Sequence, residues 1–211
     1  MPNTHRRNKK PSSRNCAACI SIPPYQRSSF ALESSDPDGS GLSKKTTKTS
    51  EMSLCFCDTS AIVKYYVTEP GSQWVWQLID LGEPVFLVEI TVAEVSAALG
   101  IMQRIGRISK RHRIQCWERF EKDCVRRYQL LPTHYRMIRT AALLCINHPL
   151  KGYDAVQVAA ALLLQQALGP ERPLTFVAGD KNVIAAAQAE GLAVDNPFWH
   201  IAENETSATL R

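Results

Sequence analysis

The sequence lacks the features that mark membrane-spanning, secreted and P-loop proteins. Its longest apolar block, AVQVAAALLLQQAL, is shorter than a membrane span requires and is interrupted by glutamines. The basic N-terminus is not followed by the apolar run that a secretory signal needs. No glycine-rich GxxxxGK[ST] loop is present, which excludes a P-loop nucleotide-binding protein.

A disulfide framework is also absent, because the seven cysteines are odd in number and irregularly spaced. Cys16 and Cys19 have the spacing of half a zinc site, but no second Cys pair or His pair lies at the usual distance. We therefore expect reduced thiols, no zinc and a cytoplasmic protein. An organelle transit peptide is an alternative, since residues 1–50 are rich in Arg and Ser, although no clear amphipathic helix accompanies them.

Charge is distributed unevenly along the 211 residues. Residues 1–51 contain nine Lys or Arg and four Asp or Glu, whereas residues 52–211 contain sixteen of each. The first segment also has few large apolar residues, so we expect a disordered basic extension. Met52 begins the first core-like pattern and is an alternative start of the protein. We expect one domain over residues 52–200 and a tail over residues 201–211.

From Met52 onward, short apolar runs alternate with helical patterns. The pattern predicts five strands, at residues 54–58, 84–90, 128–132, 174–180 and 192–197. It predicts seven helices, at residues 60–69, 72–82, 91–104, 109–126, 133–147, 154–168 and 181–191. Continuous apolar strands separated by helices indicate a parallel sheet that is covered on both faces. We therefore expect an α/β fold of three layers with a mainly parallel central sheet.

Four acidic residues lie where such a fold gathers functional groups, beyond the carboxyl ends of its strands. Two end predicted strands, Asp58 and Asp180, and two lie in the first turn of predicted helices, Glu94 and Asp154. Each also has an ordinary structural explanation, as a helix N-cap, as a turn residue or, for Thr91 to Glu94, as a capping box. However, converging carboxylates with small apolar neighbours repel one another unless a cation is present. An all-oxygen ligand set favours Mg²⁺ or Mn²⁺.

Four stretches carry a wider resemblance. They are CDTSAIVKYYVTEPGS, ITVAEVSAAL, HPLKGYDAVQVAAAL and FVAGDKNVIAAAQAEGLAVDNP, which together cover about residues 53–198. In order and spacing they resemble the PIN-domain nucleases, especially the VapC-type toxins of bacterial toxin–antitoxin pairs. The resemblance implies an α/β/α fold and a metal-dependent endoribonuclease that cleaves RNA with Mg²⁺ or Mn²⁺. It also implies a cognate antitoxin that covers the acidic cleft, and a homodimer.

The same resemblance implies roles for the acids as catalytic and metal-binding residues. Asp58, Glu94 and Asp154 match the first, second and third acids of the family, and Asp180 matches the fourth, which is the most variable. Ser60 occupies a hydroxyl position that helps to order the site. We expect Asp58 and Asp154 to be the main metal anchors, with Glu94 and Asp180 completing the shell directly or through water.

A basic segment offers a place for RNA to bind. Residues 104–139 contain eleven Lys or Arg and three acids, which indicates either a solvated helix face or a surface that grips phosphates. Trp117 and Tyr128 lie within this segment and are candidates for base stacking, although helical spacing favours core packing for Trp117.

Two other interpretations use the same elements. A HAD-like phosphohydrolase is disfavoured, because Ser60 stands where that class needs a second Asp. A non-catalytic RNA-binding or interaction module on the same fold is the alternative from a different class. Metal-dependent cleavage that EDTA stops would distinguish the nuclease from this module.

Overall fold

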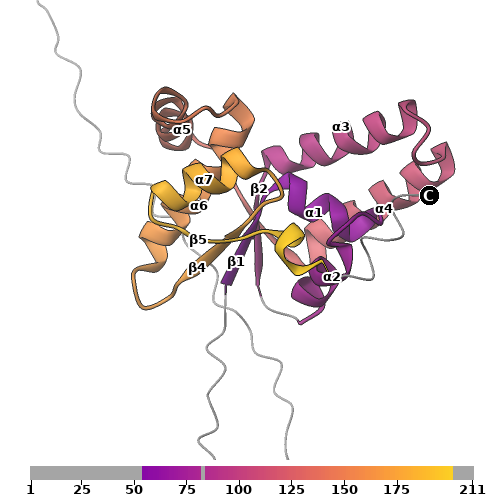
Figure 1. Cartoon of the computed structure of the whole chain (residues 1–211), viewed down its shortest axis with the longest axis horizontal. Helices are drawn as coiled ribbons and strands as arrows, with labels where there is room; N and C mark the ends of the chain where they lie inside the picture. The colour runs from indigo at the N-terminus through magenta and orange to yellow at the C-terminus, as the bar shows by residue number, and fades with distance from the viewer. Residues whose placement is uncertain (1–53, 82–83, 202–211) are drawn as a thin grey trace, which may run out of the picture. The chain divides into compact units, whose positions relative to one another are not determined.

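The computed structural model describes residues 54–81 and 84–201, and within them five strands form one sheet (Figure 1). The strands are β1 (Leu54–Cys57), β2 (Val85–Val88), β3 (Tyr128–Leu131), β4 (Leu174–Val177) and β5 (Ala193–Asp195). Their order is β3-β2-β1-β4-β5, and every neighbouring pair is parallel. The expected α/β fold with a parallel sheet is confirmed. The predicted extension over residues 1–51, and the predicted tail beyond Ile201, lie outside the described residues.

All of the predicted helices are present, with ends that differ by a few residues. They are α1 (Thr59–Tyr66), α2 (Ser72–Asp80), α3 (Ile90–Arg104), α4 (Lys110–Arg126), α5 (Tyr135–Asn147), α6 (Gly152–Leu168) and α7 (Lys181–Ala189). A short 3-10 helix, η1 (Pro197–His200), follows β5 and was not expected from the pattern. None of these described helices is both long enough and apolar enough to cross a bilayer.

The three inner strands β1, β2 and β4 bury nearly all of their side chains on both faces of the sheet, which explains their continuous apolar runs, whereas the edge strands β3 and β5 are partly exposed. In β1, Leu54 and Phe56 pack with α5, α6 and α7, whereas Cys55 and Cys57 pack with α1 to α4. Figure 1 shows these two helix layers on opposite sides of the strands. Phe56 stacks on Phe176 of β4 with ring centroids 5.7 Å apart, and both side chains are fully buried. Truncating Phe56 to alanine would therefore cost about 3–5 kcal/mol of stability.

The sheet topology opens a crevice at the carboxyl edge between β1 and β4. Because all neighbouring strands are parallel, their carboxyl ends share one edge. Helix α1 leaves β1 toward one face, and α7 leaves β4 toward the other. In open α/β sheets this divergence is where ligands bind. Asp58 and Asp180, which directly precede these two helices, are thereby brought to the crevice.

Candidate functional site

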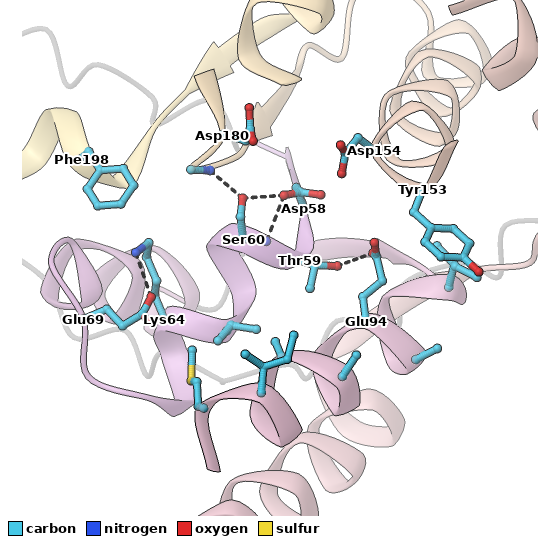
Figure 2. Close-up of a pocket in the computed structure, with 18 residues that line it drawn as sticks. Asp58, Thr59, Ser60, Lys64, Glu69, Glu94, Tyr153, Asp154, Asp180 and Phe198 are labelled. Atoms are coloured by element: carbon cyan, nitrogen blue, oxygen red, sulfur yellow. Dashed lines mark hydrogen bonds and ion pairs between the residues drawn. The ribbon is translucent and has the colours of Figure 1, made fainter. Parts of the chain in front are cut away.

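A pocket of about 790 Å³ lies at this carboxyl edge (Figure 2). It is lined by the starts of α1 and α6, by α3 and by the loop after β4. All of the acids singled out from the sequence line it, namely Asp58, Glu94, Asp154 and Asp180. The sequence therefore located this set correctly in space, and the roles of its members as catalytic and metal-binding residues stay predictions.

Asp58 caps helix α1, so its structural explanation is correct. Its Oδ2 accepts hydrogen bonds from the Ser60 backbone N–H at 2.9 Å and from Ser60 Oγ at 2.5 Å. Asp58 Oδ1 has no hydrogen-bond partner among the described residues. The side chain is buried, and burial raises its pKa from the ordinary 3.8 to about 6. The Ser60 bonds oppose this rise, whereas the charges of Glu94 and Asp154 add to it.

Ser60 connects helix α1 to the loop that follows β4. Its Oγ donates to Asp58 and accepts a hydrogen bond from the Gly179 backbone N–H at 2.7 Å. Gly179 has little free space, since an added Cβ would lie 3.3 Å from the Phe198 ring and 3.4 Å from Ser60 Oγ. The hydroxyl at position 60 therefore fixes Asp58 relative to the opposite side of the crevice.

Glu94 does not belong to a capping box, and that explanation is wrong. Helix α3 already begins at Ile90 with Glu89 at its N-cap, because a single residue separates it from β2. Glu94 therefore lies beyond the first turn, and its side chain reaches the pocket instead (Figure 2). Its Oε2 accepts hydrogen bonds from Thr59 Oγ1 at 2.6 Å and from Gln157 Nε2 at 2.6 Å. Within the described part of the chain, Glu94 Oε1 makes no hydrogen bond.

Asp154 is not the N-cap of its helix either. Helix α6 begins at Gly152 with Lys151 at the N-cap, which places Asp154 at the third helical position. The side chain is half-buried, and burial raises its pKa. A hydrogen bond from the Lys151 backbone opposes that rise, and the charge of Asp180 adds to it. The pocket therefore disfavours the charged form of both Asp58 and Asp154.

Asp180 has a double role like that of Asp58. It caps helix α7 through Oδ1, which accepts from the backbone N–H groups of Asn182 at 2.7 Å and Val183 at 3.4 Å. Its Oδ2 has no hydrogen-bond partner in the described residues. Asp58, Glu94 and Asp180 thus each use one carboxylate oxygen for the fold and keep the other available.

The four acids have no ion-pair partner among the described residues, although the charge of Lys151 acts to lower the pKa of Asp154. No Lys or Arg within residues 54–81 and 84–201 forms an ion pair with any of them. The buried Lys64 also lines the pocket, but its Nζ lies 3.1 Å from Glu69 Oε2 and 4.2 Å from the centroid of the Phe198 ring. An uncompensated set of carboxylate oxygens suits a hard divalent cation.

The four side chains surround the cavity and do not touch a common point. In the described parts of the chain, no three Asp, Glu, His or Cys side chains lie close enough together to form a ready metal-binding group. Mg²⁺ is commonly held by one or two carboxylates while it keeps several waters. The donor set therefore fits such an ion, with some contacts made through water.

The basic segment is partly occupied by contacts within the fold. Arg107 pairs with Glu69 at 2.8 Å, and Arg113 donates to Gln103 at 2.7 Å. Tyr128 is buried, so it is not available for base stacking. Trp117 packs against Phe120 with ring centroids 5.8 Å apart, as its helical spacing indicated.

Sequence reasoning missed several pocket residues. Thr59, Lys64, Tyr153 and Phe198 line the pocket, and Gln157 lies behind it. Gln157 carried a usable signal, because it is a lone polar residue in the apolar stretch AVQVAAAL and follows Asp154 by almost one helical turn. Phe198 had no such signal in the sequence, because it lies in the 3-10 helix η1, which the pattern does not predict.

Comparison with known proteins identifies the family. The family model described as PIN domain matches residues 55–169, more than half of the chain. The chain belongs to the PIN-domain family. The matched segment of this PIN domain includes Asp58, Glu94 and Asp154, whereas Asp180 lies beyond it. The resemblance inferred from the sequence is thus confirmed at the level of the family.

The matches to solved structures cover a larger share of this PIN-domain chain than the family match does. FitAcB from Neisseria gonorrhoeae is 22% identical, with a TM-score of 0.51, and the match covers 70% of this chain and 100% of that one. FitAB bound to an IR36 DNA fragment is 21% identical, with a TM-score of 0.51, covering 71% of this chain and 99% of that one. At these identities the likeness concerns the fold alone. No curated protein matches the chain in sequence.

Proposed function

We propose that the protein is a metal-dependent endoribonuclease that hydrolyses RNA phosphodiester bonds and acts as the VapC-type toxin of a toxin–antitoxin pair. The observation that carries this proposal is the pocket lined by four carboxylates, none of which forms an ion pair with a described Lys or Arg. Membership of the PIN-domain family supports the nuclease activity. The fold likeness to FitAB, which was solved bound to a DNA fragment, is compatible with a protein that works beside nucleic acid.

In this proposal the four acids divide the work of holding Mg²⁺ or Mn²⁺. Asp58 and Asp154 are the main anchors, and Glu94 and Asp180 complete the shell directly or through water. A bound ion of this kind lowers the pKa of a coordinated water and polarises a phosphoryl oxygen. Asp58 supports this role through its orientation, because two bonds from Ser60 hold Oδ2 and leave Oδ1 available.

Two surfaces beside the pocket, a basic border and an apolar wall on α3, are the proposed binding sites for RNA and antitoxin. RNA phosphates would be attracted by basic groups at its border, such as Arg107, whose partner Glu69 lines the pocket. The proposed antitoxin would lie over the apolar wall that α3 contributes, which includes the half-exposed Ile101. A homodimer is part of the same proposal and rests on the family resemblance.

Cleavage of total RNA by the purified protein tests the catalytic proposal. The protein is incubated with and without Mg²⁺, with Mn²⁺ and with excess EDTA, and the cut ends are mapped. We expect cleavage that needs the divalent ion and that Asp58→Asn abolishes without loss of the fold. RNA binding without cleavage in any metal would favour the non-catalytic module, and unchanged cleavage by Asp58→Asn would refute the assignment of the site.

Expression in a bacterial host tests the toxin proposal separately. We expect induction of the parent protein to arrest growth and induction of Asp58→Asn to have no effect. Co-expression of the small gene next to this one, if it encodes an antitoxin, should restore growth. A parent protein that cleaves RNA in vitro but never arrests growth would retain the nuclease proposal and reject the toxin.

A further inference from the structure

Gln157 is a polar residue in a position where the fold alone would favour an apolar one. It lies on α6 within a run of buried Ala and Val residues, and its side chain is fully buried. An amide buried without hydrogen-bond partners costs several kcal/mol, so a glutamine is tolerated here only because its polar atoms are hydrogen-bonded. Gln157 follows Asp154 by three positions, which places both residues on the same face of α6.

The amide group of Gln157 binds Glu94 more closely than it binds any other described group. Nε2 lies 2.6 Å from Glu94 Oε2, 3.0 Å from Thr91 Oγ1 and 3.1 Å from Thr59 Oγ1. Thr59 Oγ1 in turn donates to the same Glu94 oxygen at 2.6 Å. Because an ionised carboxylate only accepts hydrogen bonds, the amide must turn its NH₂ group toward Glu94.

These contacts cross between the two helix layers. Helix α6 packs on one face of the sheet, whereas α1 and α3, which carry Thr59 and Glu94, pack on the other. Gln157 therefore connects the layers at the carboxyl edge, behind the pocket. Two charge-assisted bonds fix Glu94 Oε2, and such bonds are about twice as strong as bonds between neutral groups.

We propose that Gln157 is a positioning residue for the metal site, a proposal that rests on the proposed function of the four acids. The amide holds Glu94 Oε2 at the back of the pocket, so that Oε1 stays directed to the metal position. It acts through Glu94 and does not touch the ion or the RNA. Groups of this kind orient metal ligands, and their loss typically weakens metal binding by about 10–100-fold.

Binding of Mn²⁺ to the full-length protein, measured by calorimetry and by electron paramagnetic resonance, tests the proposal without any cleavage assay. Gln157→Met keeps the length of the side chain but removes the donor, and we expect its Mn²⁺ affinity to fall by about 10–100-fold. Thr91→Val is the matched control, because it removes the contacts of Thr91 Oγ1 with Nε2 at 3.0 Å and with Oε1 at 3.5 Å of the same amide and leaves both donors to Glu94, Gln157 and Thr59, in place. We expect its Mn²⁺ affinity to equal that of the parent.

A double-variant comparison separates positioning from a general effect on the fold. Glu94→Gln should itself weaken Mn²⁺ binding, and adding Gln157→Met to it should weaken binding no further. If Gln157→Met does not fold, as judged by circular dichroism, Gln157→Asn replaces it, because it keeps a neutral amide but is one methylene too short to hold Glu94 Oε2. The same loss of affinity is expected for this variant at neutral pH.

The outcomes distinguish this inference from the proposed function. Parental Mn²⁺ affinity in Gln157→Met, together with lost affinity in Asp58→Asn, would overturn the positioning role and leave the metal site in place. An equal loss in Thr91→Val, or a further loss in the Glu94→Gln background, would also overturn it. Mn²⁺ binding that Asp58→Asn does not weaken would overturn the proposed function itself.

Discussion

The two ends of helix α1 carry two polar clusters that treat their acidic residues in opposite ways. At its start lies the acidic pocket, which consists of Asp58, Glu94, Asp154 and Asp180. Near its end lies a second cluster, here called the tyrosine network, which consists of Tyr65, Tyr66, Asp80, Asp123, Arg127 and Tyr128. One short helix thus allows the same residue type, aspartate, to be compared in two environments.

In the tyrosine network, each acid is matched by a donor. Asp80 Oδ1 accepts from Tyr65 Oη at 2.8 Å and pairs with Arg127 at 2.8 Å. The Tyr65 bond and then the Arg127 bond lower the pKa of Asp80. Asp123 accepts from Tyr66 Oη at 2.8 Å. Asp80 is thus stabilised in its charged form by groups of the fold itself.

In the acidic pocket, the carboxylates accept hydrogen bonds, but each also lies near other carboxylates of the same charge. Burial raises the pKa of Asp58 to about 6 in spite of its two bonds from Ser60, and the charges of Glu94 and Asp154 contribute to the rise. Groups whose charged form is disfavoured in a cleft are typical of functional sites. The comparison therefore teaches that hydrogen bonds alone do not distinguish the two clusters: Asp80 has a cationic partner in the fold, whereas none of the four pocket acids forms an ion pair with a described Lys or Arg.

The largest expected effect separates the two clusters by activity. Asp154→Asn should lower RNA cleavage by at least about 100-fold, the scale on which the loss of an electrostatic group in an active site acts. Asp123→Asn makes the same chemical change in the tyrosine network and should leave cleavage unchanged, because Asn still accepts from Tyr66. Initial cleavage rates of the two folded variants, compared side by side with the parent, measure the difference. Equal losses of cleavage rate in both variants would mean that the acidic pocket is no more important for activity than the tyrosine network.

A second effect concerns stability and has an unusual sign. The pKa of Asp58 in the fold, about 6, lies above its ordinary 3.8, so the fold favours the protonated form. The stability from this group is present below about pH 4 and is lost as the pH rises through about 6. The loss corresponds to at most about 3 kcal/mol. Asp58→Asn should therefore stabilise the metal-free protein at pH 8, while keeping a residue that caps helices well.

Denaturant unfolding in EDTA checks this expectation. The gain in unfolding free energy of Asp58→Asn over the parent should be larger at pH 8 than at pH 5. Addition of Mn²⁺ at pH 8 should stabilise the parent and not the variant, because only the parent retains the proposed anchor. A variant that is less stable than the parent at pH 8 in EDTA would show that Asp58 is a structural acid like those of the tyrosine network.

Much of the fold and part of the site were predictable because their signals are local. Strands buried on both faces are continuous apolar runs, and the acids that follow β1 and β4 are next to them in sequence. A parallel sheet then brings Asp58 and Asp180 to one edge without further information. The predicted strands ran too long at this edge, because Asp58, Glu89 and Asp180 serve as helix N-caps rather than as strand residues.

The remaining features depend on contacts between distant residues, which no local pattern encodes. Gln157 meets Glu94 across 63 positions, and Tyr66 meets Tyr128 across 62. The capping-box pattern that ends at Glu94 gave a wrong prediction, because only one residue connects β2 to α3 and the helix therefore begins one residue before Thr91. The local sequence contains the capping-box residues, but it does not show how short the connection from β2 to α3 is.

A third effect, on stability alone, probes the tyrosine network. The Tyr66 hydroxyl is bonded to Asp123 at 2.8 Å and to Tyr128 at 2.6 Å in the protein interior. Its removal in Tyr66→Phe takes this partner from the buried Tyr128 hydroxyl and the part-buried Asp123, and should cost about 1–3 kcal/mol of unfolding free energy. Cleavage and Mn²⁺ affinity should not change.

Tyr153→Phe provides the matched control for this variant. The Tyr153 side chain is 61% exposed at the rim of the pocket, and its hydroxyl makes no hydrogen bond to the described residues. Its removal should leave the unfolding free energy unchanged. A stability loss in Tyr153→Phe as large as that in Tyr66→Phe would show that the hydrogen bonds of the tyrosine network do not stabilise the fold in particular.

The smallest expected effect repeats the aspartate-to-asparagine change in the tyrosine network, at Asp80, the last residue of α2, whose partner Tyr65 lies near the end of α1. The Asp80–Arg127 pair is largely open to solvent, with side chains 57% and 35% exposed, so Asp80→Asn should cost only about 0.2–1 kcal/mol. Since the pKa of Asp80 is lowered in the fold, this stability is present near neutral pH and is lost as the pH falls through that lowered value. Screening by about 1 M salt should remove most of the difference between Asp80→Asn and the parent. Urea unfolding at low and high salt therefore should give a small, salt-sensitive loss for Asp80→Asn and a gain for Asp58→Asn. The same sign for both variants would mean that the two clusters do not differ in how they hold their acids.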